Sequence, residues 1–364
     1  MKICIIGNLN IFIYNFAKYF VEHKGFEVCL IARKRENLCN RDFSFIQIYY
    51  LESQSLVYKI IKIRQIIRKI HPDIVHTFYI SRDAIAPLLF FQRKFKYICS
   101  VFGSDFYWGL NNINKRFIFK KIIAGTDKIT FNSFQMKKDL IRQFPKLDSN
   151  KVRPIIWGVN FKLFNDINSK KINQKKKELN IRDEKIILSF RGFKHVYNQD
   201  IIIKSIPLII EKNSNVKFVF LLGNTKLEDI KDFRTFLKKE NVLGNVVFIE
   251  KFLSQEELSM FLNLSDIVIN IPKTDQFSVS LMETMASHTV PIISKLKVYE
   301  DILVNEKNAL ILNETNKDEL SKKILYAIDN YEKLLEKIVY SNNKLVSEKY
   351  NFDIQVEKII KLYE

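Results

Sequence analysis

Short apolar runs alternate along the chain with stretches in which apolar residues recur at helical spacing. The clearest case lies in the second half. Residues 267–271 form a β-branched run typical of a buried strand, residues 277–286 carry apolar side chains at helical spacing, and residues 290–293 are apolar again. A strand, a helix and a second strand in this order predict a right-handed βαβ unit of a parallel sheet.

The same rhythm runs through both halves of the chain and predicts two α/β domains. Strands are expected at residues 2–6, 26–32, 43–50, 73–76, 97–102, 128–132 and 152–156, and then at 185–190, 216–222, 246–249, 267–271 and 290–293. Helices are expected up to about residue 22 and at 55–70, 199–210, 317–331 and 348–363, and Ser254 with Glu257 forms a capping box before a further helix. The polar, Lys-rich segment 165–180 between the halves is interpreted as an interdomain connection.

Composition is consistent with two ordinary cores. The chain has 364 residues, and its apolar content of 47% excludes a disordered protein. Cys4, Cys29, Cys39 and Cys99 lack metal-site spacing and are interpreted as buried hydrophobes in a reducing compartment. The start of the chain has no signal-peptide pattern, and no apolar run approaches the length of a membrane span. We therefore expect a cytoplasmic protein, either free or peripheral on the inner face of the plasma membrane.

A formal net charge of +19 favours an anionic partner. Zinc-finger spacing and aromatic RNA-binding strands are absent, so no nucleic-acid partner is predicted. The alternatives are a solvated Lys-rich surface and an anionic membrane surface. For the membrane, the candidates are the basic face of helix 55–70 together with Lys115, Arg116, Lys120 and Lys121, which flank Phe117 and Phe119.

Two acids mark the βαβ unit as a candidate ligand site. Asp275 and Glu283 are eight positions apart, about 12 Å if the interval were helical, so they suit two ends of one long ligand rather than an acid/base pair. Between them the backbone amides of Phe277, Ser278, Val279 and Ser280 begin a helix, which favours an anion. Two carboxylates that can bind hydroxyl groups, with amides between them that can bind phosphate, would suit a nucleotide-sugar. The alternative is that Asp275 is only a helix N-terminal charge and Glu283 a solvated side chain.

Two loops elsewhere end predicted strands at the same kind of edge. Arg191 and Lys194 follow strand 185–190, and a cationic pair there suits a diphosphate. Gly7 and Asn8 follow the first strand, where open α/β folds bind ligands, although one glycine does not make a dinucleotide fingerprint.

The motif Asp-x7-Glu, followed by Thr-Met-Ala and Val-Pro-Ile-Ile, resembles the Glu-x7-Glu motif of the retaining glycosyltransferases of family 4, which have the GT-B fold. The resemblance spans residues 2–363. It implies an α/β fold of two Rossmann-like domains facing across a cleft, with domain 1–165 on the acceptor side, domain 166–345 on the donor side, and helix 346–364 returning to the first domain. It also implies that Asp275 holds donor-sugar hydroxyls and Glu283 the ribose. Ser287-His288 stands where a glycine is usual.

Further positions are similar to the family, with departures. Residues 157–164 look like the segment that closes the family's N-terminal domain. Residues 101–105 resemble its His-Gly-x-Asp loop, but Phe102 stands at the His position, which leaves Asp105 to face acceptor or sugar hydroxyls. Arg191 matches the arginine that the family places at the diphosphate. Tyr197 stands near the position of the family's lysine, so the resemblance leaves the lysine's role to Lys194 or to backbone amides. Gly223 and Phe252 follow two further strands as donor-binding candidates, and the resemblance places the loop of Phe252 beside the nucleotide base.

The predicted function is metal-independent transfer of a hexose-type sugar from a UDP- or GDP-sugar to a glycan or lipid-linked acceptor. Surface polysaccharide synthesis of the bacterial type (O-antigen, capsule or lipopolysaccharide) is the expected setting, with no cofactor, because no strand-end Asp-x-Asp is present. Three alternatives remain: a sugar-nucleotide epimerase of the same fold, an inactive accessory or scaffold subunit, and a charge-driven nucleic-acid binder. The departures at Phe102, Asp275 and Tyr197 keep the scaffold open.

Overall fold

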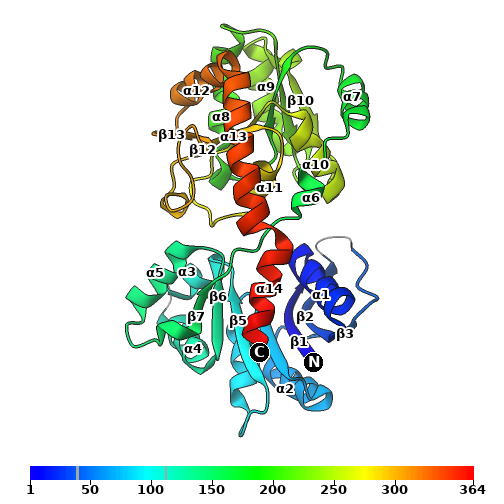
Figure 1. Ribbon diagram of the computed structural model, residues 1–364, viewed down its shortest axis with the longest axis vertical. Helices are drawn as coiled ribbons and strands as arrows, with labels where there is room; N and C mark the ends of the chain where they lie inside the picture. Colours follow the sequence, from blue (N-terminus) through cyan, green and yellow to red (C-terminus); the bar gives the residue numbers. More distant parts are fainter. Residues whose placement is uncertain (38–40, 111–112) are drawn as a thin grey trace. The chain divides into compact units, whose positions relative to one another are not determined.

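The structure, a computed structural model, describes residues 1–37, 41–110 and 113–364 (Figure 1). These residues form two compact units. Unit 1 comprises Met1–Trp157 and Val356–Glu364, and unit 2 comprises Gly158–Gln355. The boundaries lie within about ten residues of those expected at 165/166 and 345/346, and the last residues of the chain are part of unit 1.

Unit 1 is built on a parallel sheet with the strand order β3-β2-β1-β4-β5-β6-β7. Its strands are β1 (Lys2–Leu9), β2 (Glu27–Asn37), β3 (Gln47–Tyr50), β4 (Ile74–Phe78), β5 (Lys96–Val101), β6 (Lys128–Phe131) and β7 (Val152–Pro154). The helical segments are α1 (Ile11–Lys24), α2 (Leu56–Ile70), η1 (Arg82–Leu89), α3 (Ser104–Leu110), α4 (Ile113–Gly125), α5 (Phe134–Gln143) and η2 (Ser149–Lys151). Most of α14 (Phe352–Tyr363) also belongs to this unit.

Unit 2 repeats the design with the order β10-β9-β8-β11-β12-β13, again parallel. Its strands are β8 (Lys185–Ser189), β9 (Val216–Leu221), β10 (Val246–Ile249), β11 (Ile267–Asn270), β12 (Val290–Ser294) and β13 (Leu310–Leu312). The helices are α6 (Phe161–Phe164), α7 (Ser169–Glu178), α8 (Gln199–Ile210), α9 (Lys231–Lys239), α10 (Gln255–Leu264), α11 (Val279–Ala286), α12 (Lys317–Asp329) and α13 (Tyr331–Leu345). The short segments are η3 (His195–Tyr197), η4 (Leu227–Ile230), η5 (Leu243–Asn245), η6 (Lys297–Tyr299) and η7 (Val346–Tyr350).

The strands are largely apolar because helices cover both faces of each sheet, as in a doubly wound fold. Ile3, Ile5 and Ile6 of β1 are all fully buried, for example. The predicted capping box at Ser254 and Glu257 is confirmed. The segment 165–180 differs from the expectation of a plain connection, because α7 occupies most of it. Lysines on all sides of α7 hide its helical pattern, and none of its side chains is buried.

Each sheet has one point at which the strand order reverses, and ligands of open α/β folds bind at the carboxyl ends of the strands there. In unit 1 the point lies between β1 and β4. In unit 2 it lies between β8 and β11. The Arg191 loop follows β8 and the Asp275 loop follows β11, so the fold places both loops at the reversal point of unit 2.

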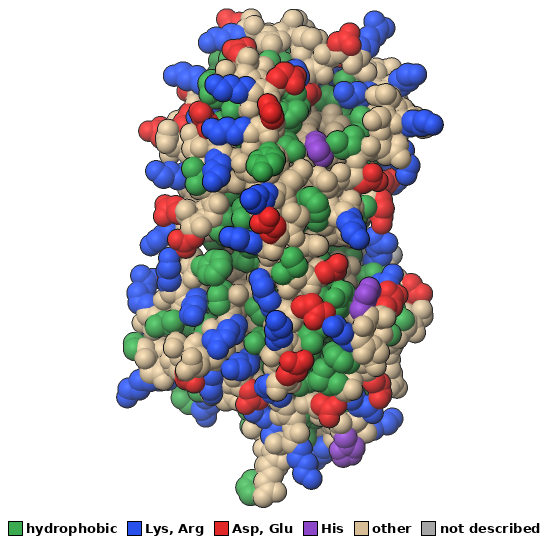
Figure 2. All heavy atoms as spheres, in the orientation of Figure 1, with side chains coloured by type: hydrophobic (Ala, Val, Ile, Leu, Met, Phe, Trp, Pro, Cys, Tyr) green, Lys and Arg blue, Asp and Glu red, His purple; other side chains and the backbone are tan. Residues whose placement is uncertain are grey.

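The visible face carries charges of both signs (Figure 2), and three cysteines are buried. Figure 2 shows Lys and Arg side chains spread over the visible face and interspersed with Asp and Glu. Cys4, Cys29 and Cys99 are buried and free, while Cys39 lies outside the described residues. Among the residues described, no helix combines the length and apolar character that crossing a membrane requires.

Candidate functional site

Arg191, directly after Phe190 at the end of β8, is the centre of a polar cluster in unit 2. Its Nη1 donates to Asp275 Oδ2 at 3.0 Å, and more distantly to Asn270 Oδ1 and Ser278 Oγ, both at 3.4 Å. The Tyr197 ring lies 4.3 Å from the guanidinium carbon. Burial works against the charge, but Asp275 and Tyr197 outweigh it and raise the pKa of Arg191. Arg191 is therefore a fixed, permanently charged group.

Asp275 has a second partner in Tyr299. The Tyr299 hydroxyl donates to Asp275 Oδ2 at 3.1 Å, and Tyr299 itself is buried. Burial, followed by the nearby Asp275 carboxylate, raises the pKa of the Tyr299 hydroxyl, so it stays a proton donor. Asp275 is thus held from two sides, so it is more than a charge at the N-terminus of a helix.

The start of α11 lies beside this ion pair. Ser278 is the N-cap residue and its Oγ accepts from the Leu281 amide at 3.3 Å. The amides of Val279 and Ser280, the first two helical residues, have no acceptor within the helix and are available to an anion. The Phe277 side chain, in contrast, is buried against the Tyr350 ring, so Phe277 can offer a ligand only its backbone.

Glu283 lies further along α11 and is only 7% exposed. Its carboxyl group has no hydrogen-bond partner among the residues described. Burial raises the pKa of this carboxyl to about 7, and the nearby Arg191 opposes the rise. The alternative interpretation of Glu283 as a solvated helix residue is therefore wrong.

The β8–α8 loop is tied to the end of β11 by two hydrogen bonds. Asn198 Nδ2 donates to the Ile271 carbonyl at 2.9 Å, and the Lys273 amide donates to the Val196 carbonyl at 2.8 Å. Gln199 also bonds the Arg191 carbonyl and the Ser189 hydroxyl. These contacts fix the backbone on both sides of Arg191.

Three other predicted residues of unit 2 lie on the same edge of the sheet without joining the cluster. The Lys194 side chain is exposed at the start of η3. Gly223 takes a left-handed conformation with φ +60 after β9, and Phe252 follows β10 and is 53% exposed. No group of three or more His, Cys, Asp or Glu side chains suited to a metal ion was found in the described part of the chain.

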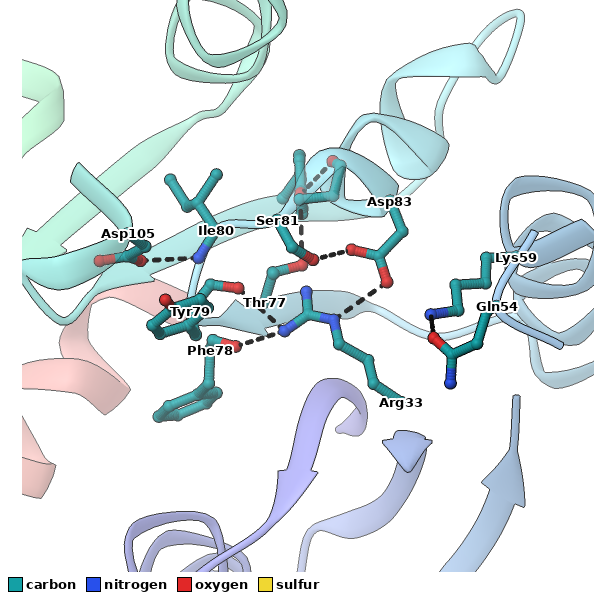
Figure 3. Close-up of polar contacts among 12 residues, drawn as sticks. Arg33, Gln54, Lys59, Thr77, Phe78, Tyr79, Ile80, Ser81, Asp83 and Asp105 are labelled. Carbon is teal, nitrogen blue, oxygen red and sulfur yellow. Dashed lines mark hydrogen bonds and ion pairs between the residues drawn. The ribbon is translucent and has the colours of Figure 1, made fainter. Parts of the chain in front are cut away.

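Asp105 has a different place from the one expected. It is 1% exposed, and its Oδ2 accepts from the Ile80 amide at 2.7 Å (Figure 3). Its Oδ1 accepts from the amides of Phe102 and Gly103 at 2.9 Å and of Phe106 at 3.1 Å. Burial raises the pKa of Asp105 to about 6, against the lowering by these amides. The carboxylate faces inward and holds two loops together. This is a structural role, whereas the sequence suggested contact with sugar hydroxyls.

A second buried group in unit 1 escaped sequence reasoning. Arg33 pairs with Asp83 at 3.0 Å and donates to the carbonyls of Phe78 and Tyr79, both at 2.9 Å (Figure 3). Tyr79 has φ +67, which a bulky residue adopts only when its surroundings hold it. Arg33 therefore fixes the loop after β4, at the reversal point of unit 1.

Gly7 and Asn8 lie within β1, not in the loop after it. A Cβ atom on Gly7 would come within 2.3 Å of the Ile13 side chain, so this glycine lets α1 pack closely. Asn8 Oδ1 is buried and has no partner among the described residues. Phe102 packs on Trp157, with ring centroids 4.5 Å apart.

Sequence reasoning missed Tyr299 and Asn270 as partners in the unit 2 cluster. Asn270 carried a usable signal, because it is a polar residue at the end of an otherwise apolar buried strand. Tyr299 carried none, since its contact with Asp275 depends on how η6 packs.

Comparison with protein families finds two matches that follow each other along the chain. Residues 2–133 match the model described as glycosyl transferase 4-like, and residues 170–345 match the model described as glycosyl transferases group 1. An uncharacterized glycosyltransferase of Methanocaldococcus jannaschii is 26% identical over 295 residues, covering 80% of this chain and 75% of the relative.

Solved structures show the same fold over the full length. A glycosyltransferase from Rickettsia africae has a TM-score of 0.81 at 16% identity, covering 100% of this chain and 98% of its own. Anabaena HepE in complex with UDP and glucose has a TM-score of 0.79 at 12% identity, covering 100% of this chain and 99% of its own. The predicted α/β fold of two Rossmann-like domains of the GT-B kind is confirmed.

Proposed function

We propose that this chain, which has the GT-B fold, is a glycosyltransferase that transfers a sugar from a UDP- or GDP-sugar to an acceptor hydroxyl. The observation that carries the proposal is the cluster of Arg191, Asp275 and Glu283 around the start of α11. It lies at the point where doubly wound sheets bind nucleotides. Structures of Anabaena HepE with UDP and with UDP-glucose, which share the fold, support this choice of donor.

Each residue has a part in the proposed reaction. Glu283 accepts hydrogen bonds from the ribose hydroxyls, which supply the partners that its buried carboxyl lacks. Asp275 holds hydroxyls of the transferred sugar. Arg191 and the amides of Val279 and Ser280 receive the charge that develops on the departing diphosphate, which is the main electrostatic task of such a transfer.

The finer features of the proposal follow the family resemblance. Transfer proceeds with retention of anomeric configuration. It needs no metal ion, because guanidinium and amide groups take the place of the cation. The acceptor is a glycan or a lipid-linked glycan of bacterial-type surface polysaccharide, O-antigen, capsule or lipopolysaccharide. The protein works in the cytoplasm, where its basic surface can meet anionic lipid. Activity that persists in excess EDTA tests metal independence, and loss restored by Mg²⁺ would contradict it.

One observation favours a second candidate, an inactive scaffold subunit. Arg191 is already paired with Asp275, so a donor must compete with an ion pair that is largely shielded from water. A scaffold would keep this pair closed.

Thermal unfolding with UDP, GDP, UDP-glucose and GDP-mannose distinguishes the two candidates. A donor-binding enzyme is stabilised by one nucleotide series in proportion to its affinity. Glu283→Ala is expected to abolish that stabilisation, while Glu211→Ala, which removes an exposed carboxylate after α8, keeps it. Wild-type protein that responds to none of the four ligands would favour the scaffold, and full retention in Glu283→Ala would refute the ribose role.

A further inference from the structure

The unit 2 cluster has less positive charge than a diphosphate requires. Arg191 is its central cation, and its charge is balanced by Asp275 at 3.0 Å. Glu283, with its pKa raised to about 7, adds negative charge above neutral pH. The diphosphate of a nucleotide-sugar brings further negative charge. Uncommitted cations must therefore come from the adjoining loops if the donor is to bind well.

Lys273 is a cation that the fold brings to this place. It lies in the loop between β11 and α11, two residues before Asp275. Its backbone amide donates to the Val196 carbonyl at 2.8 Å, which fastens it to the loop that carries Arg191. β8 and β11 are adjacent strands, so both loops leave the same edge of the sheet side by side.

The Lys273 side chain is exposed and points back across the Arg191 loop. Its Nζ lies 2.5 Å from His195 Nε2. Because an ammonium group can only donate, the imidazole nitrogen is the acceptor in this contact, and His195 offers Lys273 no opposite charge. The contact of Lys273 at the edge of the cluster is thus with an imidazole, whereas Arg191 has an acid partner.

We propose that Lys273 is a further donor-binding residue. Its ammonium group gives up the contact with His195 and binds the diphosphate of the nucleotide-sugar instead. This inference rests on the proposed function and adds a second cation to it. An oxygen of the diphosphate is a stronger acceptor for the ammonium group than a neutral imidazole. Arg191 then holds the diphosphate from the β8 side and Lys273 from the β11 side, with the α11 amides between them.

The test compares two ligands that differ only in the diphosphate. Binding of UDP and of uridine is measured by calorimetry for wild type, Lys273→Ala, Lys273→Arg and Lys212→Ala. If guanine proves to be the preferred base, GDP and guanosine replace them. Lys212 is an exposed lysine between α8 and β9, at the opposite edge of the sheet, so Lys212→Ala removes the same charge away from the cluster.

Lys273→Ala is expected to weaken UDP binding about tenfold and to leave uridine binding unchanged, because only the charge-assisted contact is lost. Lys273→Arg recovers most of the affinity and Lys212→Ala stays close to wild type. Equal UDP affinity in Lys273→Ala and Lys212→Ala would overturn the inference, as would an equal loss for UDP and uridine. If the wild-type protein binds neither UDP nor GDP, the proposed function fails instead, so the two failures are distinguishable.

Discussion

Glu283 and Asp275 belong to the same site, but their carboxyl groups differ in their hydrogen-bond partners. Asp275 has a guanidinium and a phenol as partners, so its charge is compensated in the free protein. Glu283 is buried beside the same arginine, and no hydrogen bond to its carboxyl is found among the described residues. Removing a carboxylate from water without partners favours its protonated form. Glu283 therefore links the stability of the free protein to pH.

The direction of this linkage follows from the raised pKa. The pKa of Glu283 is about 7 in the folded chain, against an ordinary value of 4.5 for a glutamate in water. Between these values the folded state holds a proton that the unfolded state has released, so the stability contribution falls as pH rises from about 4.5 to about 7. Glu283→Gln stays neutral at every pH. We expect the difference in free energy of unfolding between this variant and wild type to be about 3 kcal/mol more in favour of the variant at pH 8 than at pH 4.5.

Chemical denaturation at the two pH values measures this difference. Glu211→Gln, at an exposed carboxylate, serves as the control and is expected to show no such pH dependence. A Glu283→Gln protein whose advantage over wild type is the same at both pH values would show that Glu283 is ionised or hydrogen-bonded in solution.

Residue types and spacing revealed part of the site, and packing determined the rest. Arg191, Asp275 and Glu283 could be predicted because each lies at a fixed distance from a strand with a clear apolar pattern. Tyr299 could not, since it reaches Asp275 from a short segment without a periodic pattern. Asp105 was misassigned for a related reason. A polar residue after a strand can face the ligand or the loop backbone, and only the surrounding amides decide.

At the scale of elements, the loop between β8 and α8 determines whether Arg191 is in place. Its last residue, Asn198, has φ +53 and is buried, and it joins the loop to the end of β11. Asparagine tolerates the left-handed conformation better than most residues and here uses its amide as well. Secondary structure alone would not reveal this connection.

Two substitutions at Asn198 separate its two contributions. Asn198→Gly keeps the conformation but loses the hydrogen bond to the Ile271 carbonyl, and we expect a loss of about 1–2 kcal/mol in the free energy of unfolding. Asn198→Ala loses the bond and adds left-handed strain, so it should cost about 1 kcal/mol more. Denaturant titration of both variants measures the difference. Equal stability of the two would mean that the loop relaxes to another conformation and that the strain argument fails.

Elements with an apolar pattern were predicted well. Helix α8 has the bounds expected from its isoleucines, and β10 and its capped neighbour α10 also match. Helix α7 was missed because lysines cover it. Helix α13 was also missed, since the only helix expected in this region covered residues 317–331 and ended where α13 begins. The strand expected at 43–50 shortens to β3, since Phe43 and Ile46 are buried outside the sheet. Apolar periodicity reports burial, and burial does not require a ladder of hydrogen bonds.

At the scale of the whole molecule, the excess of basic residues calls for an anionic partner. Figure 2 shows the cations mixed with acids over the visible face, which argues against a single nucleic-acid groove there. One surface of unit 1 differs by combining cations with exposed apolar side chains. This basic-apolar surface is formed by α2, the end of η1 and α4, with Val57, Ile61, Leu89, Phe91 and Phe117 exposed.

Specific contacts join these elements. Arg64 and Arg68 of α2 lie 5.5 and 5.6 Å from the Phe90 ring, and Arg93 donates to the Gly125 carbonyl at the end of α4. The structure modifies the expected membrane surface at one point: Phe119 is buried in the core of unit 1, so Phe117 alone of that pair is exposed. The side chain of Lys115 lies outside the part of the chain that the structure describes.

We propose that this basic-apolar surface rests on anionic lipid. Sedimentation with phosphatidylglycerol vesicles should then show binding that weakens as salt rises, because screening shortens the reach of the charges. Phe91 is 93% exposed, and inserting its ring adds an apolar contribution that salt does not remove. We expect Phe91→Ser to weaken binding about tenfold, while Tyr340→Ser, at an exposed aromatic of α13 in unit 2, has little effect. Equal loss in both variants, or tighter binding to duplex DNA than to the vesicles, would contradict a lipid partner for this surface.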